Sequence, residues 1–140
     1  CPQIVQRIKE EGPLIGNHTY SHIPQNCFAS TAVMTQEIQQ TDALLAQLGI
    51  VTPYFRPPYG VTNPHIAKAA KRMGKIVVGW DIRSLDTVIK DETRLWSRVV
   101  SKLNQGNIIL MHDTSERTLH VLEQLLEYLK ANDYQVVLDL

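Results

Sequence analysis

Short apolar segments alternate with amphipathic segments along the chain, at intervals of about 25 to 30 residues. This rhythm is typical of βαβ units arranged around a parallel sheet. In parallel α/β folds the functional side chains gather just after the strands, at their carboxyl ends. We therefore expect an α/β fold with its chemistry in the residues that directly follow each strand.

Apolar periodicity and the start and stop residues of helices define the expected elements. Strands are expected over residues 14–16, 52–55, 75–80, 107–111 and 134–138. Helices are expected over residues 2–11, 37–48, 65–73, 91–103 and 115–131. The continuous apolar runs in 75–80 and 107–111 indicate strands that are buried on both faces.

Composition narrows the classes of function. With 140 residues, of which 44% are hydrophobic and 20% charged, the chain has the size and balance of one globular domain. Its 14 Lys and Arg residues equal its 14 Asp and Glu residues, so no net charge attracts nucleic acid or an anionic membrane. The longest apolar runs are too short to span a bilayer. We expect Cys1 and Cys27 to be unpaired.

Two histidines, His18 and His22, follow the first expected strand. Their spacing of four places both imidazoles on one face if the segment forms a helical turn. Two neutral imidazoles in this arrangement can chelate zinc or a similar divalent metal. The same spacing also occurs in pairs of surface histidines, which is the alternative interpretation.

The segment Arg56-Pro57-Pro58-Tyr59-Gly60 follows the second expected strand. Its two prolines stiffen the backbone and carry no N–H, so Tyr59 has the next amide that can donate. A rigid turn that presents one N–H suits the developing oxyanion of an acyl-transfer reaction. The alternative is a proline-rich loop with a surface arginine.

His112 directly follows the strand expected over 107–111, and Asp113 comes next. A histidine at the end of a strand is either structural or a general acid or base. Proton delivery by an imidazole is normally assisted by a carboxylate partner. Asp86 is the candidate partner, and Asp81 is a nearby alternative.

Taken in order, these three clusters resemble the later active-site motifs of the polysaccharide deacetylases, the NodB-homology group of metal-dependent carbohydrate esterases (family four). The resemblance covers essentially the whole chain, but the family's first motif, Thr-Phe-Asp-Asp-Gly, is absent from the sequence. It implies a partial or irregular (β/α) barrel with about five of about seven strands. Residues 1–140 would then be a single domain without its first strand or two, completed by an N-terminal segment or a second chain.

The resemblance also implies a role for each candidate residue. His18 and His22 would be metal ligands for zinc, or for cobalt, nickel or manganese. The amide of Tyr59 would hold the oxyanion, and Arg56 would hold a catalytic aspartate. The remaining site residues would be His112 as general acid, Asp86 as its partner, and Pro58 and Leu110 at the substrate.

We therefore expect a metal-dependent deacetylase that acts on an acetylated glycan such as peptidoglycan or a chitin-like polymer, in the cell envelope or secreted. The alternative is a catalytically incompetent domain that binds only metal or glycan, because the family's general base and third ligand belong to the absent motif. Asp86 is followed by Thr87, where relatives often have tryptophan, so one aromatic wall of the pocket is expected to be missing. The sequence contains neither Gly-x-Ser-x-Gly, which would indicate an α/β hydrolase, nor Gly-x-Gly-x-x-Gly, which would indicate a dinucleotide-binding enzyme.

Overall fold

The computed structural model describes residues 2–137. They form two compact units, the first ending at Gly79 and the second beginning at Trp80. Each unit combines helices with one pair of parallel strands, and each is described by itself. The prediction that residues 1–140 form a single domain stays a prediction.

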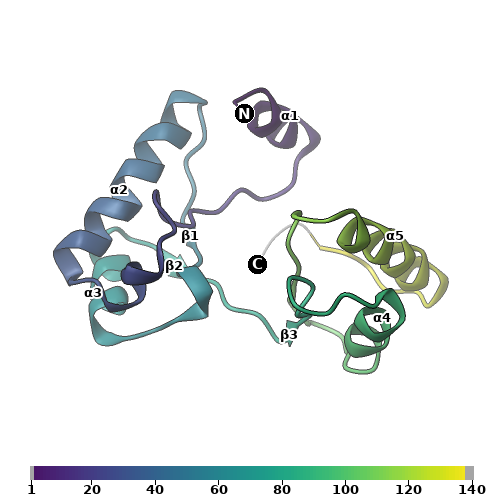
Figure 1. Cartoon of the computed structure of the whole chain (residues 1–140). Helices are drawn as coiled ribbons and strands as arrows, with labels where there is room; N and C mark the ends of the chain where they lie inside the picture. Colours follow the sequence, from purple (N-terminus) through teal and green to yellow (C-terminus); the bar gives the residue numbers. More distant parts are fainter. Residues whose placement is uncertain (1, 138–140) are drawn as a thin grey trace. The chain divides into compact units, whose positions relative to one another are not determined.

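The described residues of the first unit contain five helical segments and two strands. In chain order its elements are α1 (Pro2–Glu11), η1 (Pro24–Phe28), α2 (Thr31–Gln47), β1 (Tyr54–Phe55), η2 (Pro58–Gly60), α3 (Pro64–Arg72) and β2 (Ile76–Val77). The helices α2 and α3 lie side by side (Figure 1). Their contact forms the core of the unit, which consists of Met34, Ile38, Phe55, Ile66, Ala69 and Ala70.

The sheet of the first unit is short. β1 pairs in parallel with β2, with Tyr54 opposite Ile76. Asn17 joins the other side of β1 through an isolated parallel bridge to Phe55. Two backbone hydrogen bonds of 2.9 Å make this bridge, one from Asn17 N to Tyr54 O and one from Arg56 N to Asn17 O. The bridge therefore brings the segment after Asn17 next to the segment after β1.

The second unit contains β3 (Ile82–Arg83), α4 (Glu92–Val100), β4 (Ile109–Leu110) and α5 (Glu116–Ala131). β3 and β4 pair in parallel, so that their carboxyl ends lie at the same edge. Figure 1 shows α4 beside α5. The core of this unit consists of Ile82, Val99, Leu125 and Leu129.

The helices agree well with the sequence predictions. α1 has the predicted bounds, and α3, α4 and α5 begin directly after Asn63, Asp91 and Ser115, whose side chains accept hydrogen bonds from the first turn. The predicted start of the second helix at residue 37 is wrong, because α2 begins at Thr31. Ser30 caps it by accepting a hydrogen bond from Val33 N, and the extra turn buries Met34.

The strands agree less well. Within the described residues no strand forms over 14–16 or 134–137, and Leu138 lies outside them. The prediction for 75–80 is wrong in length and burial: β2 holds two residues, and Ile76 and Val77 are 56% and 41% exposed. β4 is half-buried rather than buried. The chain leaves the first sheet after β2 and begins β3, which was not predicted, in the second unit.

Two smaller points complete the description. None of the described helices has the length and apolar content that crossing a lipid bilayer requires. Cys27 is buried and carries a free thiol, while Cys1 lies outside the described residues. The fold class is α/β with few strands, as the sequence predicted.

Candidate functional site

His18 and His22 lie side by side in the first unit. Their ring centroids are 4.7 Å apart with the planes tilted by 59°, and the ring of His22 lies 5.1 Å from that of Tyr59. The segment between the histidines is not the helical turn considered from the spacing. Thr19 and His22 adopt positive φ values of 68° and 48°, and these left-handed residues turn the chain so that the rings meet.

A backbone carbonyl fixes the tautomer of His18. Its Nδ1 lies 2.7 Å from the carbonyl oxygen of Arg56. A carbonyl can only accept, so in the neutral ring Nδ1 carries the proton and the lone pair is on Nε2. Histidines that bind metals commonly donate their second nitrogen in this way, because the bond orients the ring and makes the other nitrogen more basic.

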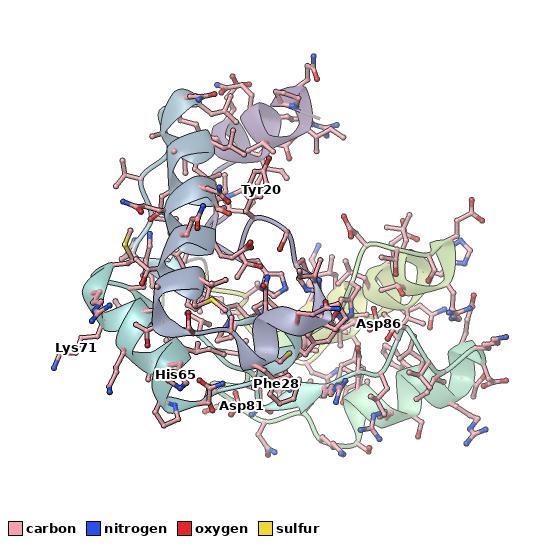
Figure 2. All side chains as sticks on the ribbon, turned by 60° about the vertical axis from the view of Figure 1, so that its left-hand side comes forward. Tyr20, Phe28, His65, Lys71, Asp81 and Asp86 are labelled. Atoms are coloured by element: carbon pink, nitrogen blue, oxygen red, sulfur yellow. The ribbon has the colours of Figure 1, made fainter. Side chains whose placement is uncertain are left out.

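The loop that carries the histidines is held by Glu37 of α2. Its Oε2 accepts hydrogen bonds from the amides of Tyr20 and Ser21, at 3.0 and 2.8 Å. Burial raises the pKa of the Glu37 carboxyl, but the hydrogen bonds from Ser21 and Tyr20 outweigh this effect, so that the pKa is lowered. Glu37 is therefore a carboxylate under ordinary conditions. Tyr20 is labelled in Figure 2.

Asn17 anchors the start of the same loop. It is 1% exposed, and its Oδ1 accepts a hydrogen bond of 3.0 Å from Thr19 N. Its Nδ2 donates to the carbonyl of Ile38 and to Oδ1 of Asp42, at 2.9 and 2.8 Å. Asp42 also pairs with the buried Lys75 at 2.7 Å. The loop is thus connected to α2 at its start and at its middle.

The turn after β1 presents the amide of Tyr59. Gly60 N donates to Pro57 O at 3.1 Å, and Val61 N donates to Pro58 O at 3.2 Å. The Tyr59 amide takes no part in these turn hydrogen bonds, and the residue has a φ of 57°. Pro58 is buried at the start of η2. This geometry suits an amide that donates to a ligand.

The side chain of Arg56 binds the segment after β2. Its Nε donates to Val78 O at 3.3 Å and its Nη2 donates to Gly79 O at 3.0 Å. Burial lowers the pKa of Arg56, which nevertheless remains a cation at any physiological pH. The arginine thus fixes the end of β2 relative to β1.

The second unit brings Asp86 and His112 together at the carboxyl ends of β3 and β4. His112 Nδ1 lies 2.9 Å from Asp86 Oδ1, and the His112 amide donates to Asp86 Oδ2 at 2.6 Å. The Asp86 side chain is fully buried, whereas that of His112 is 44% exposed. The predicted pairing is therefore present, with the imidazole held by one nitrogen and reaching solvent. Figure 2 labels Asp86.

Two hydroxyl groups complete the surroundings of the Asp86 carboxylate. Ser84 Oγ donates to its Oδ1 at 2.9 Å and Thr118 Oγ1 donates to its Oδ2 at 3.3 Å. Burial raises the pKa of Asp86, but the hydrogen bonds from His112 and Ser84 outweigh this effect and the pKa is lowered. Arg117 Nη2 donates to the backbone carbonyl of Asp86 at 3.2 Å. The carboxylate is therefore a fixed negative charge beneath His112.

The other residues of this unit have simpler positions. Leu110 lies half-buried in β4, opposite Arg83, and its carbonyl accepts a hydrogen bond from Ser84 N. Asp81 does not approach His112 in the pairs described; its Oδ2 accepts the amide of Ile108 at 2.7 Å. Of the two aspartates considered for His112, only Asp86 pairs with it.

The donor groups partly fit a metal ion. Two neighbouring imidazoles, with His18 in the tautomer that metal-binding histidines commonly have, would suit two ligands of a divalent metal ion. Among residues 2–137 no group of three or more His, Cys, Asp and Glu side chains is gathered. The histidine pair and the Asp86–His112 pair lie in different units, and the prediction that they share one site stays a prediction.

Sequence reasoning missed the residues that support these pairs. Glu37 was predicted only as the first residue of a helix, and Asn17 only as the residue that follows the strand expected over 14–16. Ser84 and Thr118 were given no role. Each of these residues contacts a functional residue that is either far away in the sequence or on the other side of a turn. The spacing of residues in the sequence does not reveal such contacts.

Comparisons with known proteins agree with the motifs. The family model described as polysaccharide deacetylase matches residues 1–78. The peptidoglycan-N-acetylglucosamine deacetylase PgdA of Listeria monocytogenes is 31% identical over 137 residues, which cover 97% of this chain and 28% of that protein. The chain spans between about a quarter and a half of the length of the curated relatives that match it first.

Solved structures share the fold. The family 4 carbohydrate esterase from Streptomyces lividans in complex with acetate has a TM-score of 0.86 and 30% identity, covering 95% of this chain and 69% of that one. BA3943 of Bacillus anthracis, described as a pseudoenzyme of the same family, has a TM-score of 0.87 and 24% identity, covering 96% of this chain and 48% of that one. At this lower identity the second likeness shows the fold alone.

Proposed function

Because the chain belongs to the polysaccharide deacetylase family, we propose that it takes part in the hydrolysis of acetyl groups from an acetylated glycan. The preferred substrate class is a polymer of N-acetylglucosamine such as peptidoglycan, which the name of the Listeria relative supports. Such a substrate would be met in the cell envelope or outside the cell. The observation that carries the proposal is the pairing of a buried Asp86 with the exposed imidazole of His112.

In the proposed reaction water adds to the acetyl carbon, the carbon–nitrogen bond breaks, and acetate and a free amine are released. His112 donates a proton to the leaving nitrogen from Nε2, since its Nδ1 is bonded to Asp86. Asp86 stabilises the protonated imidazole and fixes its orientation, as carboxylate partners of catalytic histidines do.

The first unit would contribute the remaining roles. The amide of Tyr59 donates to the oxygen on which negative charge develops, in a turn that two prolines make rigid. His18 and His22 would hold a divalent metal, most simply zinc, which when bound supplies Lewis-acid activation of water. Pro58 and Leu110 would line the acetyl group. The proposal assigns no residue of this chain as general base.

The test measures metal and product together on the 140-residue chain. The purified chain is analysed for zinc, cobalt, nickel and manganese, and acetate release is followed on chitooligosaccharide and on peptidoglycan. His18→Ala should remove the metal, and His120→Ala, an exposed histidine on α5, should not. Acetate release that depends on both His18 and His112 would support the proposal.

Other outcomes decide against it. Metal that is retained in His18→Ala would contradict the assigned ligands. Stoichiometric metal without any acetate release would favour the alternative, a domain that binds metal or glycan without catalysis. Absence of both metal and acetate would reject the proposal for this chain.

A further inference from the structure

We infer that Glu37 is a positioning residue for the histidine pair: by binding the loop between them, its carboxylate holds the imidazoles of His18 and His22 side by side. The inference concerns the arrangement of the two rings. It rests on the proposed function only where metal affinity serves as a readout.

The contacts of Glu37 fall on the two middle residues of the loop. One carboxylate oxygen, Oε2, accepts both backbone amides, from Tyr20 at 3.0 Å and from Ser21 at 2.8 Å. The other, Oε1, accepts the hydroxyl of Ser21 at 3.0 Å. These three bonds reach from α2 to a loop 16 and 17 residues earlier in the chain. They restrain the backbone directly between the histidines.

Asn26 of η1 closes the arrangement. Its Nδ2 donates to Glu37 Oε2 at 3.2 Å and lies 3.1 Å from Ser21 Oγ, and the residue is 3% exposed. Glu37 therefore accepts four hydrogen bonds and donates none. An ionised carboxylate accepts four such bonds through its two oxygens, and its charge makes each bond stronger than a bond to a neutral acceptor. The charge of Glu37 therefore strengthens its hold on the loop.

The backbone on both sides of these amides is strained. Thr19 and His22 have φ values of 68° and 48°, a region that non-glycine residues enter only at a cost in free energy. Such conformations persist only where the surroundings hold them. Asn17 restrains Thr19 by accepting a hydrogen bond from its backbone N–H, and Glu37 restrains Tyr20 and Ser21 in the same way. Without Glu37 the loop is expected to relax and the rings to separate.

The packing of α2 does not depend on Glu37. The helix is held by Met34 and Ile38, which are fully buried in the core of the first unit. Glu37 is only partly buried and lies between them in sequence. A substitution at Glu37 can therefore disturb the loop while the helix stays in place, which makes the inference testable in a folded chain.

The test compares Glu37→Ala with wild type in the metal-free chain by NMR. We expect hydrogen exchange at the amides of Tyr20 and Ser21 to accelerate by at least about tenfold, and the nuclear Overhauser contact between the His18 and His22 rings to weaken or vanish. Glu127→Ala, the same change at an exposed site on α5, should alter neither. Glu37→Asp keeps the charge and should preserve part of both signals.

Zinc affinity provides a second readout. Partners of metal ligands commonly contribute about 10- to 100-fold in affinity, so Glu37→Ala should weaken zinc binding by about tenfold or more while Glu127→Ala leaves it unchanged. If Glu37→Ala does not fold, Ser21→Ala, which removes only the hydroxyl donor to Oε1, replaces it with a smaller expected effect in the same direction.

The outcomes separate the inference from the proposed function. Unchanged amide exchange and an unchanged ring contact in the variant would overturn the inference, whatever the chain catalyses. Faster exchange with an unchanged ring contact would also overturn it, because Glu37 would then hold the loop but not the histidines. A wild-type chain that binds no zinc would count against the proposed metal site, while exchange and ring contact would still decide the role of Glu37.

Discussion

His112 donates two hydrogen bonds to one buried carboxylate, that of Asp86, through its ring Nδ1 and through its backbone amide. The ring bond orients the imidazole, and the amide bond fixes the backbone from which the ring extends. Because the Asp86 side chain is fully buried, its charge is poorly screened by water and acts mainly on its hydrogen-bond partners. The predictions for the second unit follow from this pair.

Asp86→Asn should destabilise the chain by about 2 kcal/mol. The substitution keeps the shape, but the amide NH₂ faces donors from His112, Ser84 or Thr118, and at least one donor loses its acceptor. Chemical denaturation at neutral pH measures the change. Asp113→Asn alters a neighbouring exposed aspartate and should shift stability by less than about 0.5 kcal/mol. Equal effects of the two substitutions would contradict this account.

Stability should also depend on pH through Asp86. Its pKa is lowered in the folded chain relative to an ordinary aspartate near 3.9, so the folded state favours the ionised form. The resulting stabilisation is present above the unfolded pKa and is lost as pH falls through the folded pKa. Denaturation of wild type and Asp86→Asn should therefore differ most near neutral pH and converge below about pH 4. Glu37 titrates in both proteins and cancels in the difference.

Thr118→Val should cost about 1 kcal/mol. Valine keeps the volume of a side chain that is 4% exposed, but it removes the hydroxyl that bonds Asp86 and Ser115. Thermal or chemical unfolding gives the value, with Thr93→Val on the exposed face of α4 as the matched control. We also expect the ring of His112 to become more mobile, observable as line broadening of its NMR signals. A variant as stable as the control would show that the hydroxyl is dispensable.

In the first unit, Asn63→Ala should destabilise the chain by about 2 kcal/mol. The Asn63 side chain accepts the amides of His65 and Ile66 at the start of α3, and its Nδ2 donates to the carbonyl of Cys27 at 2.9 Å. Asn63→Asp keeps the helix cap and removes only the donor, so it should lose less than half as much. If both variants lose the same amount, the bond to Cys27 and not the cap is the important contact.

Much of the helical structure could be predicted because its signals are local. α3 and α5 begin after capping residues and carry apolar side chains at helical spacing, and α1 is ended by Gly12 and Pro13. The first six residues of α2 were missed because their mixture of small, polar and β-branched side chains gives a weak pattern. The extra length is stabilised by the burial of Met34 in a cluster that includes residues of β1 and α3, which are distant in sequence.

The strands were harder because their identity depends on pairing. β3 is a two-residue strand bordered by Asp81 and Ser84, too short to show an alternation. The apolar segment 75–80 indicated a buried strand, but the structure leaves Ile76 and Val77 exposed. An apolar sequence shows that a segment can be buried, and not whether another element covers it. Register and coverage are properties of the partner strand and of the helices above it.

For the site, residue types could be predicted and their supports could not. The order of the three clusters indicated the histidine pair, the Arg56 turn and His112 with Asp86, and the structure brings together the members of each pair within its own unit. The left-handed backbone at Thr19 and His22 could not be predicted, because it depends on Glu37 and Asn17, which reach the loop only in the folded chain.

The proton on His18 Nδ1 is bonded to the main chain of residue 56 and not to its side chain. Every amino acid has that carbonyl, so mutation of the arginine does not change the tautomer of the histidine as long as the backbone of the turn keeps its conformation. Arg56→Lys or Arg56→Gln would change the contacts to Val78 and Gly79 and leave the histidine its acceptor. Two roles that share one residue can therefore diverge independently during evolution, one through the choice of side chain and the other through backbone shape.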